Sequence, residues 1–290
     1  MNLENMVASG PSGAYEALQL YRSKTIKAKS KGDILPAIVL CGRGAKGLLK
    51  GGYDNAGVEL TNLFLEICSE AALDVTSNNE IRTLVNEIDD SFKEDSTLRI
   101  DFLRSCVKWT SKCGPREIGD AIIHLQLASC LWNQAFNSTN TKRDISNAIC
   151  HYAAGEGPQY LCDKIMCSYT EVSQQEKRDQ ALTLGVSHFL AVENLRDANE
   201  LFAMYHKAHK NKGIESKKSQ LIIFCDQLLQ LSKRDQAVAL FYKLIEAYMK
   251  IPNVDENVVA LLNGPIGQKI FGLQPRPNVM SMISSLLGSV

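Results

Sequence analysis

Apolar residues recur every three or four positions along almost the whole chain, and alternation of apolar with polar residues is scarce. A period near 3.6 residues is typical of amphipathic helices, whereas a period of two indicates strands. In the first segment the inward series is Tyr15, Leu18, Tyr21 and Ile26, and the outward series is Arg22, Lys24, Lys27 and Lys29. The pattern therefore predicts an all-α fold.

Glycine, proline and capping residues mark the ends of the predicted helices. Gly32 interrupts the first helix, Asp33 can cap the second, and Pro36 fits a first turn, where its missing donor has no partner anyway. The second helix should fade at Gly51–Gly52. Apart from this second helix, the pattern predicts helices over residues 13–31, 53–71, 79–92, 98–113, 117–136, 144–153, 159–172, 176–193, 195–210, 219–231, 234–249 and 256–271.

Two parts of the chain repeat at the same distance. Ala198, Leu201 and Phe202 recur as Ala237, Leu240 and Phe241 (237 − 198 = 39), and Ala17 is echoed by Ala56 (56 − 17 = 39). An offset of 39 residues lies in the range of helix-turn-helix solenoids. We therefore expect a tetratricopeptide-like α-solenoid of antiparallel helix pairs, an architecture that usually binds other proteins.

Composition is that of an ordinary globular protein. The 290 residues are 45% hydrophobic and 22% charged, which excludes disordered and fibrous classes. No apolar run approaches the roughly 20 residues of a membrane-spanning helix, and residues 1–12 do not resemble a secretory signal. Nine irregularly spaced cysteines without a CxxC pair indicate reduced, mostly buried thiols. We expect a cytosolic protein that does not insert into membranes.

Charge is uneven along the chain although the net charge is zero. Residues 1–52 hold eight basic and three acidic side chains (8 − 3 = +5), and residues 53–101 hold three basic and twelve acidic ones (3 − 12 = −9). Neither part has the basic surface with interleaved aromatics that nucleic acid requires. The asymmetry favours a charged surface for docking a protein.

One motif resembles a nucleotide site. Residues 42–47 read GRGAKG, a literal GxGxxG after an apolar run, and Glu66 lies near the distance of a ribose-binding acid. Such a fingerprint requires a strand that feeds a helix inside a βαβ unit, and no further parallel strands are predicted. The alternative is that the small residues let the second helix pack closely against its neighbours.

The sequence contains no recognisable catalytic or metal-binding constellation. The five histidines form no HExxH motif, so solvated or capping histidines are expected, and no serine lies in a GxSxG motif. We therefore expect no metal, no cofactor and no enzymatic activity.

Charged side chains gather on the first helices. Arg43, Lys46 and Lys50 extend the positive character of the first helix, and Glu59 and Glu66 are seven residues apart, which puts them on one helix face. These residues form either a solvated face or a mixed patch that docks a partner, whose binding would weaken with salt.

Short segments and single residues along the chain form a recognisable series: Gly13–Ala17 with Tyr21–Arg22, Glu59–Leu60, Phe64–Glu66, Val107–Ser111, His124–Trp132, Gly155–Gly157, Gly267–Gln268, Phe271–Gly272, Pro275 and Ile283–Gly288. In this order they resemble the Golgi-to-ER traffic protein four family, the scaffold of the guided entry of tail-anchored proteins pathway. The resemblance implies a non-enzymatic α-solenoid. It also implies an adaptor that links a targeting ATPase, through a ubiquitin-like partner, to a tetratricopeptide co-chaperone, and that joins a chaperone complex in metazoan members.

Residue roles follow only by this resemblance. Tyr15, Arg22 and Lys27 match the aromatic and basic surface that docks the ATPase, and Glu59 and Glu66 match the acids that restrain ATP hydrolysis before substrate loading. The implied layout is a flexible N-terminus (1–12), an ATPase-docking half (13–153), a half that docks the ubiquitin-like partner (154–272) and a tail (273–290). Within that tail, residues 280–287 are either a final half-buried helix or a docking peptide.

One segment departs from the family pattern. Members that bind the ubiquitin-like partner often carry a long apolar hairpin before a late helix, but residues 210–218 are short and polar. This chain would then bind the ubiquitin-like partner differently, weakly or not at all. A generic tetratricopeptide-like subunit of another complex is the alternative function, and no C-terminal winged-helix segment typical of such subunits is visible.

Overall fold

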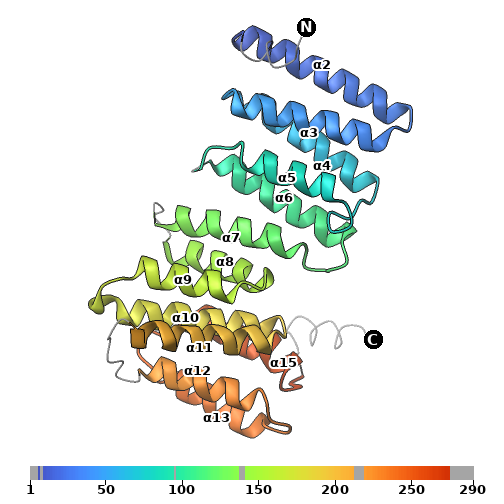
Figure 1. Ribbon diagram of the computed structural model, residues 1–290. Helices are drawn as coiled ribbons and strands as arrows, with labels where there is room; N and C mark the ends of the chain where they lie inside the picture. Colours follow the sequence, from blue (N-terminus) through green and yellow to red (C-terminus); the bar gives the residue numbers. More distant parts are fainter. Residues whose placement is uncertain (1–5, 7–8, 95, 137–140, 212–218, 275–290) are drawn as a thin grey trace, which may run out of the picture. The chain divides into compact units, whose positions relative to one another are not determined.

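All regular structure in the described part of the chain is helical. The computed structural model describes residues 6, 9–94, 96–136, 141–211 and 219–274, and the helices of each part lie side by side in Figure 1. The predicted all-α class is confirmed. The chain divides into two compact units, Met1–His151 (unit 1) and Tyr152–Val290 (unit 2).

The helix bounds follow the predicted ranges closely in unit 1. Unit 1 contains α2 (Pro11–Ser30), α3 (Ile34–Lys50), α4 (Asp54–Glu70), α5 (Asn79–Asp89), α6 (Thr97–Cys113), α7 (Ala121–Ala135) and most of α8 (Thr141–Ala154). The predicted helix 117–136 begins only at α7. Gly119 has a left-handed φ of 104° and Asp120 caps α7 by accepting the amides of Ile122 and Ile123.

Unit 2 deviates more from the predicted ranges. It contains α9 (Pro158–Ser168), α10 (Gln175–Ala191), α11 (Leu195–Asn211), α12 (Gln220–Leu231), α13 (Val238–Tyr248), α14 (Glu256–Leu261), a π-helical turn (Leu262–Ile266) and α15 (Gly267–Lys269). The predicted single helix 256–271 is wrong. Gly264 leaves the helical region and Pro265, inside the turn, lacks an amide donor, so the chain kinks there.

Helices of unit 1 pack against near neighbours in the chain, and several pack on the second helix along, as α2 does on α4 and α3 on α5. The helix α3 lies between α2 and α4, and α4 packs on α6. Side-chain bonds tie alternate helices together: Arg22 to Glu59, Arg82 to Asp120, and Gln126 to Asn86 join residues that are 37, 38 and 40 positions apart. These separations lie within two residues of the 39-residue period of the sequence.

The two copies of the 39-residue repeat in unit 2 differ in which of their matching residues are buried. Ala198 and Ala237 are both buried, but Leu201 is fully buried whereas Leu240 is 48% exposed. The predicted helix 234–249 begins only at Val238, because Gln236 adopts a left-handed φ of 54°. The two copies therefore occupy different positions relative to the helix start.

Two predictions about the first helices are wrong in detail. Tyr15 and Ile26, expected to point inward, are 64% and 48% exposed. At about 100° per residue both lie on the flank of α2 and not on the side of the buried Leu18 and Tyr21. Asp33 occupies the N-cap position of α3, but its side chain makes no capping hydrogen bond.

The GxGxxG motif lies in the middle of α3 and serves packing. A Cβ atom at Gly44 would lie 2.6 Å from the ring of Tyr21 on α2 and 2.8 Å from Leu60 on α4. At Gly42 it would lie 3.3 Å from Leu84 on α5. The dinucleotide hypothesis is wrong because the motif neither follows a strand nor opens a helix.

Most cysteines are buried thiols, as expected. Cys41, Cys68, Cys106, Cys130, Cys162 and Cys225 are buried, and Cys150 and Cys167 are exposed. Burial raises the pKa of the Cys41 and Cys225 thiols to about 12, so both are protonated at neutral pH.

The expectation of solvated histidines is wrong for His124. It is 4% exposed, and its Nε2 donates to the carbonyl of Ile118 at 2.7 Å. Its unprotonated Nδ1 then accepts from Nδ1 of His151 at 2.8 Å. Burial, with the nearby Arg116, lowers the pKa of His124. The hydrogen bond between the two rings joins α7 to α8, and its donor is His151 while His124 is neutral.

Two glycines of α3 should respond oppositely to alanine. Gly44→Ala should lower the free energy of unfolding by about 1–2 kcal/mol, because the new methyl group overpacks Tyr21 and Leu60. Gly47→Ala is the matched control. Nothing lies within 4 Å of its Cβ position, so it should stabilise by about 0.5–1 kcal/mol. Urea unfolding of both variants measures this, and equal effects would contradict the packing role.

Acid should destabilise the fold through His124. The unfolded chain takes up a proton at the ordinary pKa of 6.5 while the folded chain resists it, so stability is lost as pH falls below about 6.5. His188 acts in the same sense, because burial lowers its pKa to about 4. His124→Gln should therefore flatten part of the decline in urea midpoint between pH 7 and pH 5. An unchanged slope would show that His124 does not titrate in this range.

Candidate docking surface

The structure brings two of the predicted site residues into direct contact. Arg22 on α2 donates to the carboxylate of Glu59 on α4. Their side chains are 51% and 44% exposed, so both charges remain accessible to solvent. The ion pair thus lies on the outside of the α2–α4 contact and is open to a partner.

A second ion pair lies further along the same two helices. Lys29 of α2 bonds Glu70 of α4 at 2.5 Å. The pKa of Lys29 is raised by the hydrogen bond with Glu70, and Glu66 adds to it through space. Glu59, Glu66 and Glu70 are spaced by seven and four residues and share one face of α4. The acids therefore line up opposite the basic residues of α2.

Apolar side chains lie on the same flank of α2. Tyr15 is two helical turns before Arg22, and Ile26 is one turn after it. Both are largely exposed. We call this surface the α2–α4 edge, and its members are Tyr15, Arg22, Ile26, Lys29, Glu59, Glu66 and Glu70.

Lys27 does not belong to the α2–α4 edge. It is five residues after Arg22, which turns it by about 140° around α2. It is exposed, and within the described ranges it forms no ion pair. A flat partner that covers Arg22 would therefore leave Lys27 outside the contact.

The basic residues of α3 are separate from this edge. Lys46 of α3 bonds Glu87 of α5 at 2.9 Å, and Arg43 is exposed. The pairings of Lys29 with Glu70 and of Lys46 with Glu87 were not predicted from the sequence. The available signal was an opposite charge 41 residues later in both cases (70 − 29 = 41, 87 − 46 = 41).

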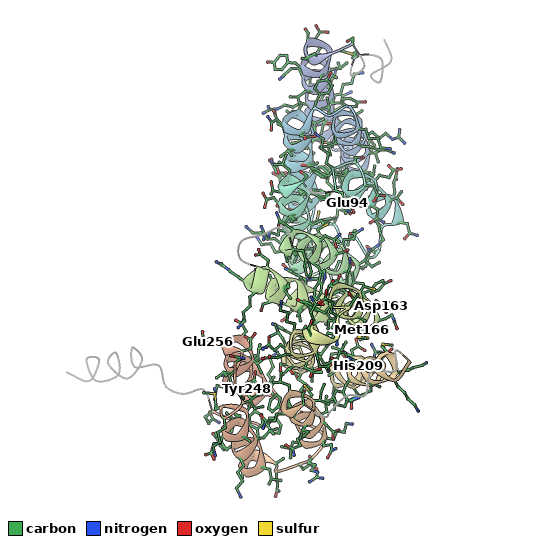
Figure 2. The ribbon with its side chains drawn as sticks, turned by 90° about the vertical axis from the view of Figure 1, so that its left-hand side faces the viewer. Glu94, Asp163, Met166, His209, Tyr248 and Glu256 are labelled. Carbon is green, nitrogen blue, oxygen red and sulfur yellow. The ribbon has the colours of Figure 1, made fainter. Side chains whose placement is uncertain are left out.

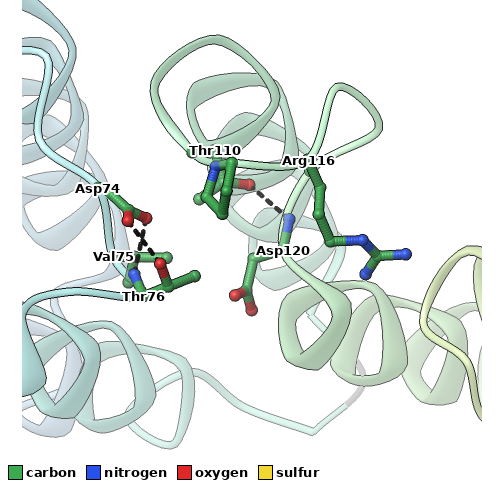
Figure 3. A pocket seen from close by; sticks show the side chains of 9 residues that line it. Asp74, Val75, Thr76, Thr110, Arg116 and Asp120 are labelled. Carbon is green, nitrogen blue, oxygen red and sulfur yellow. Dashed lines mark hydrogen bonds between the residues drawn. The ribbon is translucent and has the colours of Figure 1, made fainter.

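A small polar hollow in unit 1 is too small for a ligand. Asp74, Thr76, Thr110 and Asp120 line it, its volume is about 10 Å³, and this admits one water molecule. Figure 3 shows Arg116 pointing away from both carboxylates. Burial acts to raise the pKa of Asp120, but Arg82 and the amides of Ile122 and Ile123 together outweigh burial and lower the pKa. The residues that line the hollow connect neighbouring helices, and the hollow is not a candidate active site.

Unit 2 carries an apolar groove between α12 and α13. Two adjoining hollows of about 200 Å³ and 320 Å³ share Gln227, Leu244 and Ala247 as lining residues. Ile223 and Leu240 border the hollows and are 42% and 48% exposed. We call this feature the α12–α13 groove. One of its hollows is also lined by Tyr248, labelled in Figure 2.

Two kinds of feature were not found in the described ranges. No helix there is long and apolar enough to cross a membrane. No group of three or more histidine, cysteine, aspartate or glutamate side chains there could hold a metal ion.

Comparisons with known proteins agree with one another. The family model described as "Golgi to ER traffic protein 4" matches residues 31–289. "Protein GET4" of Arabidopsis thaliana is 22% identical, with 94% of this chain and 90% of that protein covered. "Golgi to ER traffic protein 4 homolog" of Homo sapiens is 24% identical, with coverage of 95% and 82%.

A solved structure gives the fold independently. The crystal structure of C. therm. Get4 superposes with a TM-score of 0.76 at 21% identity and covers 99% of this chain and 94% of that one. At this identity the likeness concerns the fold alone. It confirms the predicted α-solenoid.

Proposed function

Because the chain belongs to the Golgi to ER traffic protein 4 family, we propose that it is a non-enzymatic cytosolic adaptor. Unit 1 docks a targeting ATPase of tail-anchored proteins, and unit 2 holds a ubiquitin-like partner that recruits a tetratricopeptide co-chaperone. The adaptor promotes insertion of tail-anchored proteins into the endoplasmic reticulum membrane. It acts by surface complementarity and neither binds nucleic acid nor enters the membrane.

The observation that carries this proposal is the α2–α4 edge. It combines the exposed side chains of Tyr15 and Ile26 with two ion pairs in which a basic residue of α2 meets an acidic residue of α4. Apolar anchors give a docking surface most of its affinity, while surrounding charges steer the encounter and fix its orientation. The edge therefore suits a partner that has an apolar patch between charged groups.

Within the edge, the basic and acidic residues have different roles. Arg22 binds the ATPase directly, and Glu66 regulates it from the neighbouring helix. Lys27 stays a candidate for a second contact, on the other side of α2. The segment that would hold a family-type hairpin falls mostly on residues 212–218, outside the described residues.

Reversing the Arg22–Glu59 pair separates a docking role from a structural one. Arg22→Glu should weaken ATPase binding about tenfold at low salt, because it removes a cation from the contact and also repels Glu59. The swap Arg22→Glu with Glu59→Arg restores an ion pair within the chain. It should recover the thermal midpoint but not the affinity, as measured by titration calorimetry at two salt concentrations.

The matched control is the swap Lys46→Glu with Glu87→Lys, which reverses an ion pair between α3 and α5. It should leave the affinity unchanged. If the Arg22/Glu59 swap regained full affinity, Arg22 would act only by holding α2 to α4. An affinity that Arg22→Glu leaves unchanged would indicate that the ATPase docks elsewhere.

Glu66→Lys should change the rate of the ATPase more than its affinity. The proposed role of Glu66 is to restrain ATP hydrolysis, so its reversal should raise the rate in the complex while binding stays largely intact. Glu70→Lys is the control, because Glu70 shares the helix face and already bonds Lys29. Equal rates for both variants and the unaltered chain would remove Glu66 from the proposal.

A further inference from the structure

Within the described residues, the α12–α13 groove lies on the outer side of the last helix pair of a stack. α12 packs on α10, α11 and α13, but α14, which follows in the chain, returns to pack on α10. The outer side of the last pair therefore keeps Ile223 and Leu240 exposed beside the two hollows. In a solenoid this position is usually covered by a further helix or has a polar surface.

Residues just before the end of the described part of the chain pack on α13, one of the two helices of the groove. Phe271, just after α15, stacks on Phe241 of α13 with ring centroids 3.8 Å apart. Lys269 anchors α15 through an ion pair of 3.1 Å with Glu193. Residues 275–279 can span about 17 Å when extended, more than the diameter of one helix, so residue 280 can reach the far flank of α13.

The segment that follows has the right chemistry to fill an apolar groove. Residues 280–287 read MSMISSLL and carry no charge. Five of these residues are apolar, and three of the five, at positions 280, 283 and 287, have the spacing of one helix face. Arg234, Lys243 and Lys250 line the groove, and no carboxylate does so among the described residues. An uncharged segment avoids repulsion there, and its serines suit Gln220, Gln227 and Gln230 along the groove.

We propose that residues 280–287 of the same chain bind in the α12–α13 groove and complete the last helical layer of unit 2. Positions 280, 283 and 287 face the apolar floor formed by Ile223, Leu240 and Leu244. This inference goes beyond the adaptor function and does not depend on the ATPase or on the ubiquitin-like partner.

Hydrogen exchange of the full chain tests the proposal. Ile283→Asp with Leu287→Asp puts two charges on the apolar positions and should release the segment. Amides of α12 and α13 should then exchange about tenfold faster than in the unaltered chain, while α2–α4 stay unchanged. The matched control is Ser281→Asp with Ser285→Asp, which adds the same charges to the opposite side and should leave exchange unaltered.

A substitution in the groove itself completes a double-mutant cycle with the Ile283/Leu287 variant. Leu240→Asp changes an exposed side chain of the groove, and in its presence the Ile283/Leu287 variant should cause no further acceleration. Equal exchange in all chains would overturn the proposal, as would equal acceleration by both pairs of aspartates. Protection that disappears on dilution, together with a dimer in sedimentation velocity, would show that a second copy fills the groove instead.

Discussion

Close packing of α3 between its two neighbours is the interaction on which unit 1 depends. Gly44 has no side chain, and this lets the ring of Tyr21 and the methyl group of Leu60 both approach the backbone of α3 at this position. α2 and α4 thereby come near enough for Arg22 to reach Glu59. The outer charged edge is thus a consequence of an inner glycine, and the two features belong to one packing arrangement.

Much of this fold could be predicted from the sequence because the forces are local. The period of apolar residues and the Gly32 and Gly51–Gly52 breaks predicted α2, α3 and α4 to within a few residues. Deviations occur where one backbone angle decides the outcome, as at Gln236 and Gly264. No periodicity reveals such an angle, because it depends on how the surrounding helices constrain the turn.

The candidate docking surface could be predicted only in part. Spacing along one helix placed Glu59 and Glu66 together, but grouping Arg22 with Lys27 ignored the turn of about 140° between them. Pairings across helices, such as Lys29 with Glu70, depend on the stacking distance and not on the local sequence. Exposure of Tyr15 depends likewise on which neighbours cover that flank of α2.

The half-exposed pair of Arg22 and Glu59 has a kinetic consequence. An ion pair at the surface contributes little to stability, because water already solvates both charges well. Breaking this ion pair therefore costs little free energy. Arg22 and Glu59 can then each pair with an opposite charge on another protein. A contact built on such exchange would form and dissociate quickly, which suits the proposed adaptor role.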